Sequence, residues 1–378
     1  MIPASTLKSP AHALPFWLSL ALVPMVFVAA TQGGWWFLIV PIAAWWVLGA
    51  LDTVLGLYSK NADPSTPDAD LGLYRLVTML WAPVQIAMIF GLIWFVQTAT
   101  TLSAWEKTGL FFSVGVLTGS VGITYSHELM HQKNRLERWL ADILLASVLY
   151  SHFRSEHLLV HHRHVGTPAD AVTARYNEGF HRFFPRVLRQ SAVSAIKAEA
   201  RMLARKKLPW WHRSNPLWRY AALQLSFLLA AFALGGWGGA GLFALQAFVA
   251  IWQLELINYI EHYGLTRKHL GDGRYERMQP RHSWNSTHRA SNWLLINLQR
   301  HADHHVKPDR RYPLLQTYDD NTAPHLPHGY PLMSIAAMIP PLWKRIMNPR
   351  VKRWRARHYP EIEDWHPYNK ALNPLPRG

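Results

Sequence analysis

The amino-acid sequence predicts an all-α membrane protein with six transmembrane helices and a cytoplasmic histidine-rich domain. Three observations predict this fold class. The 378-residue chain is 50% hydrophobic, contains 19 Trp residues and is only 16% charged, so it is more apolar and aromatic than an ordinary soluble domain. Its apolar residues gather in long runs, and its histidines gather in short clusters, two of which begin where a run ends. We expect residues 1–378 to form a single domain.

Each apolar run is long enough to cross a hydrocarbon layer as a helix of about 20 residues. The predicted spans are residues 13–30, 35–57, 75–98, 108–126, 218–236 and 238–260. Polar residues 61–67 link the second span to the third, and the glycine-rich residues 235–239 form a tight connection between the fifth and sixth. Only His12 among the 21 histidines precedes position 127, so we expect the first three spans to provide a scaffold without ligands.

The distribution of positive charge orients the predicted spans. Of the 39 Lys and Arg residues, Lys107 alone falls on one side of the membrane, and all others fall on the opposite side. By the positive-inside rule, the two termini and the hydrophilic segments 127–217 and 261–378 are therefore cytoplasmic. All four histidine clusters are predicted to lie on this side.

The net charge of +16 and the absence of cysteine restrict the possible partners and cofactors. In a soluble protein such a charge would favour nucleic-acid binding, but here the topology accounts for it, and we expect no nucleic-acid partner. Basic loops beside membrane spans are expected to contact membrane lipid, and they also suit an acidic protein partner. Without cysteine, the chain has no disulfides, haem-thiolate ligand or iron–sulfur cluster.

The histidine clusters predict a metal centre. Within each cluster the spacings are three or four residues, which on an α-helix brings imidazoles onto one face. The candidate ligands are His127, His131, His157, His161, His162, His262, His301, His304 and His305. Nine imidazoles exceed the coordination capacity of one ion, so we expect two metals. All-imidazole sites with open positions suit iron, copper or zinc better than magnesium or calcium.

Each cluster also has a simpler interpretation. The segment HELMH at residues 127–131 matches the HExxH motif of zinc metalloproteases, including intramembrane ones. The segment HLLVHH at residues 157–162 could be a basic helix face, and His262 alone could be structural. The metalloprotease alternative leaves the other seven clustered histidines unexplained. Five further histidines are expected to lie on the surface or to support the ligands from outside: His152, His164, His269, His282 and His288.

Carboxylates within or beside the clusters are predicted to form a second shell around the metals. A ligating imidazole normally donates its other ring N–H to a carboxylate or a carbonyl. The candidates for this role are Glu128, Glu156, Asp170, Glu261 and Asp303, and any of them could instead bind metal directly.

The order HxxxH, HxxxHH, NYxEHYG and HxxHH resembles the integral-membrane alkane 1-monooxygenases and their relatives that hydroxylate the methyl groups of xylene or cymene, within the membrane desaturase and hydroxylase superfamily. The resemblance covers residues 126–131, 150–168, 258–265 and 297–305, and the six-span layout agrees with it. The nine histidines fall on the positions of the family's iron ligands. One departure is Val160, where better-known members have Gly, and it leaves the substrate range open.

The resemblance implies a di-iron monooxygenase of the bacterial inner membrane, with two iron ions as cofactors and O2 as co-substrate. Its substrate would be the terminal methyl group of an alkane or alkyl chain, and a xylene- or cymene-type hydroxylase or a fatty acid desaturase remains as an alternative. A hydrophobic substrate would enter from the bilayer through a cavity between the helices. We expect Trp45, Trp46, Trp81 and Phe90 to line this cavity.

The resemblance also implies an external electron donor, because the chain has no cysteine and no nucleotide-binding fingerprint. The expected donor is a rubredoxin or ferredoxin with its NAD(P)H reductase. Its docking surface is predicted at the basic stretches 201–207 and 350–357. These stretches could equally contact membrane lipid instead of an electron carrier.

Overall fold

The computed structural model describes residues 1–99 and 101–377, and within them the prediction of an all-helical fold is confirmed: there are isolated β-bridges but no strands. Five helices are long and apolar enough to cross a membrane: Pro10–Gln32, Gly34–Leu55, Asp68–Thr98, Ala104–Met130 and Pro216–His262. They comprise α2 (Pro10–Ala13), η1 (Leu14–Ala21), α3 (Leu22–Gln32), η2 (Gly34–Leu38), α4 (Ile39–Pro41), η3 (Ile42–Val47), α5 (Leu48–Leu55), η4 (Asp68–Leu71), α6 (Gly72–Thr98), α7 (Ala104–Leu117), η5 (Thr118–Ile123), α8 (Thr124–Met130) and α13 (Pro216–His262).

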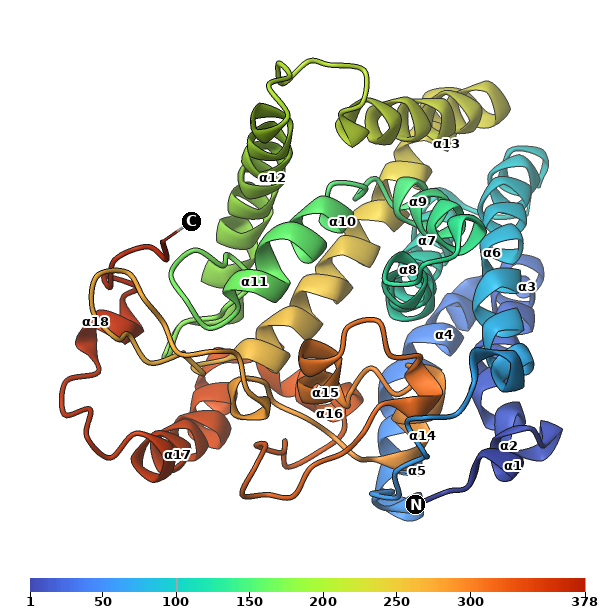
Figure 1. Cartoon of the computed structure of the whole chain (residues 1–378). Helices are drawn as coiled ribbons and strands as arrows, with labels where there is room; N and C mark the ends of the chain where they lie inside the picture. The colour runs from blue at the N-terminus through green and yellow to red at the C-terminus, as the bar shows by residue number, and fades with distance from the viewer. Residues whose placement is uncertain (100, 378) are drawn as a thin grey trace.

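The predicted fifth and sixth spans are joined in α13, so the structure contains five candidate spanning helices where the sequence predicts six. The helix is broken at Gly235 and Gly236, whose backbone angles are not helical. Gly236 has a φ of 56°, a left-handed conformation that glycine adopts without strain. Figure 1 shows the two segments of α13 running in different directions on either side of this break. The segments correspond to the two predicted spans.

The remaining helices belong mainly to the two hydrophilic segments. They are α1 (Ala4–Leu7), α9 (Arg135–Ser147), α10 (Phe153–Glu156), η6 (His157–His161), α11 (His162–His164), α12 (Phe180–Arg205), η7 (Pro280–His282), α14 (Arg289–Leu294), α15 (His301–Val306), η8 (Tyr312–Leu314), α16 (Tyr330–Met338), α17 (Pro340–His358) and α18 (His366–Asn369). Figure 1 shows the second segment of α13 passing diagonally through the middle of the molecule, with α10 and α11 on one side.

Small residues let the fourth spanning helix approach α13 closely. A Cβ atom at Gly115 would lie 2.7 Å from the carbonyl oxygen of Gln246, and one at Gly119 would lie 2.9 Å from the Cα atom of Ala250. Hydrogen bonds cross the same interface, including one of 3.0 Å from Gln253 Nε2 to Ser120 Oγ. Small side chains and polar bonds between helices are typical of packing in membranes. This interface fixes the end of α8 relative to the end of α13.

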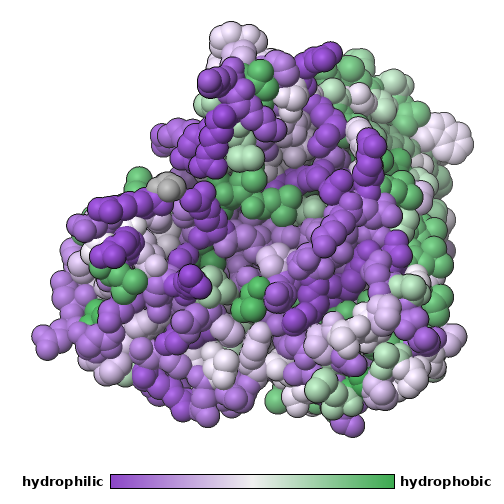
Figure 2. Space-filling view, in the orientation of Figure 1, coloured by the Kyte–Doolittle hydropathy of each residue, from purple (hydrophilic) through white to green (hydrophobic). Residues whose placement is uncertain are grey.

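The surface divides into an apolar and a polar part. Figure 2 shows hydrophobic residues along the upper right edge, on the side of α13 and α6, and hydrophilic residues over most of the rest of this face. On the first segment of α13, Leu225, Leu229 and Phe232 are exposed. Exposed leucines and phenylalanines on a long apolar helix suit contact with lipid.

Candidate metal centre and substrate cavity

All nine predicted histidines come together at one place, although they belong to four separate segments. His127 lies in α8, and His131 caps its C-terminus. The second cluster occupies η6 and α11, the third histidine ends α13, and the fourth cluster lies in α15. The candidate ligand atoms form two groups, in each of which all atoms lie within 4.8 Å of one another. One group is His127, His131, His157, His162 and His304, and the other is His161, His262, His301 and His305.

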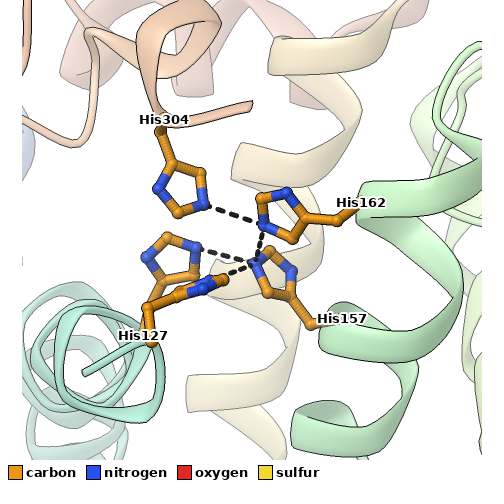
Figure 3. A group of neighbouring side chains, drawn as sticks. His127, His157, His162 and His304 are labelled. Carbon is orange, nitrogen blue, oxygen red and sulfur yellow. Dashed lines mark hydrogen bonds between the residues drawn. The ribbon is translucent and has the colours of Figure 1, made fainter. Parts of the chain in front are cut away.

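In the five-histidine group, the Nε2 atoms face a common centre (Figure 3). His157 Nε2 lies 2.9 Å from His127 Nε2 and 3.1 Å from His131 Nε2. His162 Nε2 lies 2.9 Å from His157 Nε2 and 3.0 Å from His304 Nε2. Residues from α8, η6, α11 and α15 thus direct the same ring atom toward one point.

The four-histidine group is built in the same way. His301 Nε2 lies 3.2 Å from His262 Nε2 and 3.1 Å from His305 Nε2. The His161 ring completes the group, with centroid distances of 4.7 Å to His262 and 4.9 Å to His305. All four side chains are buried.

The electrostatics of the site favour the neutral form of several imidazoles, and the neutral form is the one that binds metal. Burial lowers the pKa of His131 to about 3. Burial, followed by repulsion from the neighbouring imidazoles, holds the pKa of His157, His304 and His305 well below the ordinary value. A neutral imidazole carries one N–H, so several Nε2 atoms about 3 Å apart cannot all be paired by hydrogen bonds. A cation at each centre satisfies their lone pairs, and the two groups could therefore hold metal ions.

A π-helical turn divides the second cluster in a way that its spacing did not predict. An α-helical HxxxH pair would share one face, yet His157 joins the five-histidine group and His161 the four-histidine group. The reason is η6, a π-helix over His157–His161. In a π-helix, residues five apart rather than four apart are neighbours, and His157 and His162 accordingly meet. Single π-turns of this kind are common at functional sites.

The carboxylates that were expected to orient the imidazoles differ in their surroundings. Asp170 contacts an imidazole nitrogen that points away from the four-histidine centre, with its Oδ2 atom 3.1 Å from His161 Nδ1. Thr173 Oγ1 donates to the same carboxylate oxygen at 2.7 Å. Glu261 is placed differently, because its Oε2 lies 3.2 Å from His301 Nε2, the ring atom that faces the centre.

The other three carboxylates contact no imidazole among the hydrogen bonds of the described residues. Glu128 accepts a hydrogen bond of 3.0 Å from Gln132 Nε2. Asp303 accepts hydrogen bonds from Tyr318, Gln316 and Arg310, which tie the chain after α15 to the site. Glu156 is fully buried with no hydrogen-bond partner in the described part of the chain. An orienting role for these carboxylates stays a prediction.

An apolar cavity of about 50 Å³ reaches the histidines. His127, His157 and His301 line it, so it contacts both histidine groups. Its walls include Trp45, Leu48, Ile123, Phe153, Leu254, Ile257, Leu294, Leu295 and Leu298. The π-helical turns at residues 42–47, 118–123 and 157–161 all contribute residues to this wall.

Of the four aromatic residues predicted to line the cavity, only Trp45 does so. Trp46 is 57% exposed, because neighbouring residues on the helix point in different directions. Trp81 is buried and donates a hydrogen bond of 2.8 Å to Gln85. Phe90 packs against other phenylalanine rings between helices. The prediction was wrong for these three residues because position along a span does not reveal which face meets a cavity.

Most residues of the cavity wall are not singled out by the sequence, and Asn258 and Tyr330 are two polar examples. Asn258 lines the wall and lies one helical turn before His262, so its spacing within NYIEHYGL was an available signal. Tyr330 lines the wall from α16 and donates a hydrogen bond of 2.8 Å to Glu261 Oε1. Nothing in the local sequence around Tyr330 indicates this long-range contact. Val160, the departure noted above, is buried and lies outside the residues that line this cavity.

Comparison with known proteins places the chain in a family. The model of the fatty acid desaturase family matches residues 103–336, which include all nine histidines. The chain is 36% identical over 359 residues to alkane 1-monooxygenase 2 of Pseudomonas aeruginosa, covering 88% of this chain and 95% of the relative. It is 38% identical over 364 residues to alkane 1-monooxygenase 1 of the same organism, covering 94% of each.

A more distant relative acts, by its name, on aromatic compounds. It is the xylene/toluene monooxygenase hydroxylase component XylM of Pseudomonas putida, 28% identical over 349 residues, with 89% of each chain covered. The long apolar helices agree with a membrane protein. The chain therefore belongs to the fatty acid desaturase family and, within it, to the alkane 1-monooxygenases, a group of oxidoreductases.

Proposed function

We propose that this membrane enzyme is a di-iron monooxygenase that hydroxylates the terminal methyl group of alkanes or alkyl chains with O2. The observation that carries the proposal is the apolar cavity that His127, His157 and His301 line, so that both histidine groups contact it. A slender, unbranched chain fits such a cavity end-on, so that its last carbon stops beside the imidazoles.

The two groups suit two iron ions, one held by five histidines and one by four. Imidazole ligands with open coordination positions are compatible with iron, which when bound supplies the O2 activation that an unpolarised C–H bond requires. The protein buries or half-buries the nine side chains, keeps water away from the cavity with leucine, isoleucine and phenylalanine side chains, and orients the substrate chain. Asp170 fixes the His161 ring through its Nδ1 atom.

The family relationship favours a linear alkyl substrate over the alternatives. The relatives at 36% and 38% identity are named alkane 1-monooxygenases, whereas the xylene/toluene relative is 28% identical. The metalloprotease alternative accounted only for His127 and His131, and family membership in the desaturases removes it.

We further propose that a rubredoxin or ferredoxin, with its NAD(P)H reductase, delivers electrons on the basic cytoplasmic surface. The stretch Arg201–Lys207 ends α12, and most of its charged side chains are exposed. In α17, Lys352 and Arg353 are exposed as well. Arg355 was predicted to belong to this surface, but it is only 5% exposed and donates a hydrogen bond of 2.8 Å to the carbonyl oxygen of Gly264. It is therefore a structural residue.

The membrane topology of the chain is also a proposal. We infer six spans, with the two segments of α13 crossing separately, both termini in the cytoplasm, and insertion in the bacterial inner membrane. The charge asymmetry around Lys107 supports this topology. At 1.5 Å per residue, each segment of α13 reaches about 28 Å or more, which matches a hydrocarbon layer of about 30 Å.

Product analysis tests the proposed reaction. Cells that express the chain with a rubredoxin and its reductase are given a mixture of linear alkanes, alkylbenzenes and fatty acids, and the products are identified by mass spectrometry. We expect primary alcohols of the alkanes, and none in cells that express a His157→Ala variant. Benzylic alcohols alone would assign the enzyme to the aromatic methyl hydroxylases, and new double bonds would assign it to the desaturases.

A further inference from the structure

A second cavity, of about 190 Å³, lies apart from the metal centre, between the N-terminal segment and α14. Figure 1 shows α14 close to the N-terminal helices and to α5. Its apolar wall comes from the start of the first spanning helix, where Pro15 and Phe16 face Trp293 of α14. Its polar wall contains Lys60, Arg289 and Arg300. No carboxylate lines it.

The three cations of this cavity make no ion pair within residues 1–99 and 101–377. Arg300 is 4% exposed and donates to the carbonyl oxygens of Tyr58, Lys60 and Leu315, while its Nε has no partner. The Arg289 guanidinium lies over the Tyr58 ring at 5.1 Å, and its buried Nε also lacks a partner.

Some half-buried arginines in the described chain are neutralised by carboxylates, whereas the buried Arg355 bonds to the carbonyl oxygen of Gly264. Arg154 pairs with Asp142 at 2.5 Å, and Arg186 pairs with Glu178 at 2.8 Å. Of the three cations, Arg300 is buried, Arg289 is half-buried and Lys60 is exposed. A cation removed from water is costly without a counter-ion, and the residues that line the cavity supply none for Arg300 and Arg289.

The position of the cavity identifies the source of this anion. Pro15 and Phe16 belong to the first turns of the first spanning helix, and Tyr58 and Lys60 follow directly after the second one. These are the points at which both helices leave the membrane on the same side, at the level of the lipid headgroups. We infer that the cavity binds the phosphate group of an anionic phospholipid, with Lys60, Arg289 and Arg300 around the phosphate and the acyl chains along Pro15 and Phe16.

Counting retained lipid tests this inference. The parent and a K60Q/R289Q variant are reconstituted in phosphatidylcholine nanodiscs with or without phosphatidylglycerol, returned to mild detergent, and analysed by native mass spectrometry. We expect the parent to retain about one phosphatidylglycerol per chain, and the variant to bind it roughly 30-fold more weakly, as the loss of two membrane-surface cations implies. Arg300 is left unchanged because it also binds three carbonyl groups.

Two further variants separate the site from general effects of charge and folding. K344Q/R345Q removes two cations from α17, far along the chain, and should retain phosphatidylglycerol like the parent. A11W keeps every charge but fills the cavity from its exposed side, and should lose the lipid. Equal retention by all four proteins would overturn the site. Displacement of the lipid by inorganic phosphate at low concentration would overturn the lipid as its source.

Discussion

Tyr330 donates a hydrogen bond of 2.8 Å to Oε1 of Glu261, whose other oxygen lies 3.2 Å from His301 Nε2. Tyr330 and Glu261 both line the apolar cavity, so this pair stands between the substrate path and the four-histidine group. The hydroxyl group fixes the carboxylate without touching an imidazole itself. Tyr330 is thus a positioning residue, and Glu261 is the carboxylate that approaches the proposed metal position from the cavity side.

We predict that Tyr330→Phe lowers the hydroxylation rate by roughly 10- to 100-fold, because loss of a hydrogen bond to a carboxylate costs on the order of 1.5–3 kcal/mol. The variant should keep its iron but change its iron spectroscopic signature, since the Glu261 carboxylate becomes free to turn. Tyr318→Phe is the matched control, because Tyr318 donates to Asp303, which contacts no imidazole. An unchanged rate and spectrum in Tyr330→Phe would remove Tyr330 from the site.

The division of the histidines into two groups makes a quantitative prediction about metal content. We expect about two iron ions per purified chain, since each buried group exceeds the three imidazoles of a typical catalytic site. Replacing His131 or His304 by Ala removes a ligand of the first group, and replacing His305 by Ala removes one of the second. Each variant should fall to about one iron per chain while still inserting into the membrane. His282→Ala, outside both groups, should keep both ions.

Metal content and activity of these variants distinguish the possible outcomes. A chain that carries one zinc ion and no iron would contradict the proposed chemistry. Loss of both ions on any single substitution would show instead that the two groups form one cooperative site. Either result is measured by elemental analysis of the detergent-purified protein.

Trp45 is predicted to set the length of the alkane that fits. It is half-buried in the cavity wall and is held by an edge-to-face contact with Trp252 at 6.2 Å. Replacing Trp45 by Ala removes the indole and extends the cavity, so the alkane that is hydroxylated fastest should become longer. The adjacent Trp46→Ala is the control, because Trp46 is 57% exposed and absent from the wall. Identical chain-length profiles for both variants would mean that substrate reaches the histidines by another route.

Sequence patterns could pick out the nine candidate histidines because metal-ligand spacing is a local property of the chain, and their role as ligands stays a prediction. Four short segments supplied nine histidines, and the folded chain brings all nine together. The sequence could not predict which histidine belongs to which group. The π-turn at His157–His161 makes His162, and not His161, the neighbour of His157. The Glu261–Tyr330 contact joins residues 69 positions apart, and no periodicity reports such a pair. Hydropathy located the membrane helices, but it could not tell that Trp45 faces the cavity and Trp46 does not.

The last prediction concerns electron delivery. An acidic carrier is steered to a basic surface by long-range charge, and a Debye length of about 8 Å at physiological ionic strength makes this steering sensitive to salt. Reversing the exposed pair Lys352 and Arg353 in α17 should raise the carrier concentration needed for half-maximal rate, and should flatten its dependence on salt, without changing iron content or product. The same charge reversal at Lys206 and Lys207 tests whether the end of α12 docks the carrier.

If these surfaces contact only lipid, the variants would instead keep the parent's dependence on carrier concentration and differ in how easily they are extracted from the membrane. Rates measured against carrier concentration at two salt levels separate these outcomes, and superimposable curves for the parent and both variants would exclude the two surfaces from the electron path.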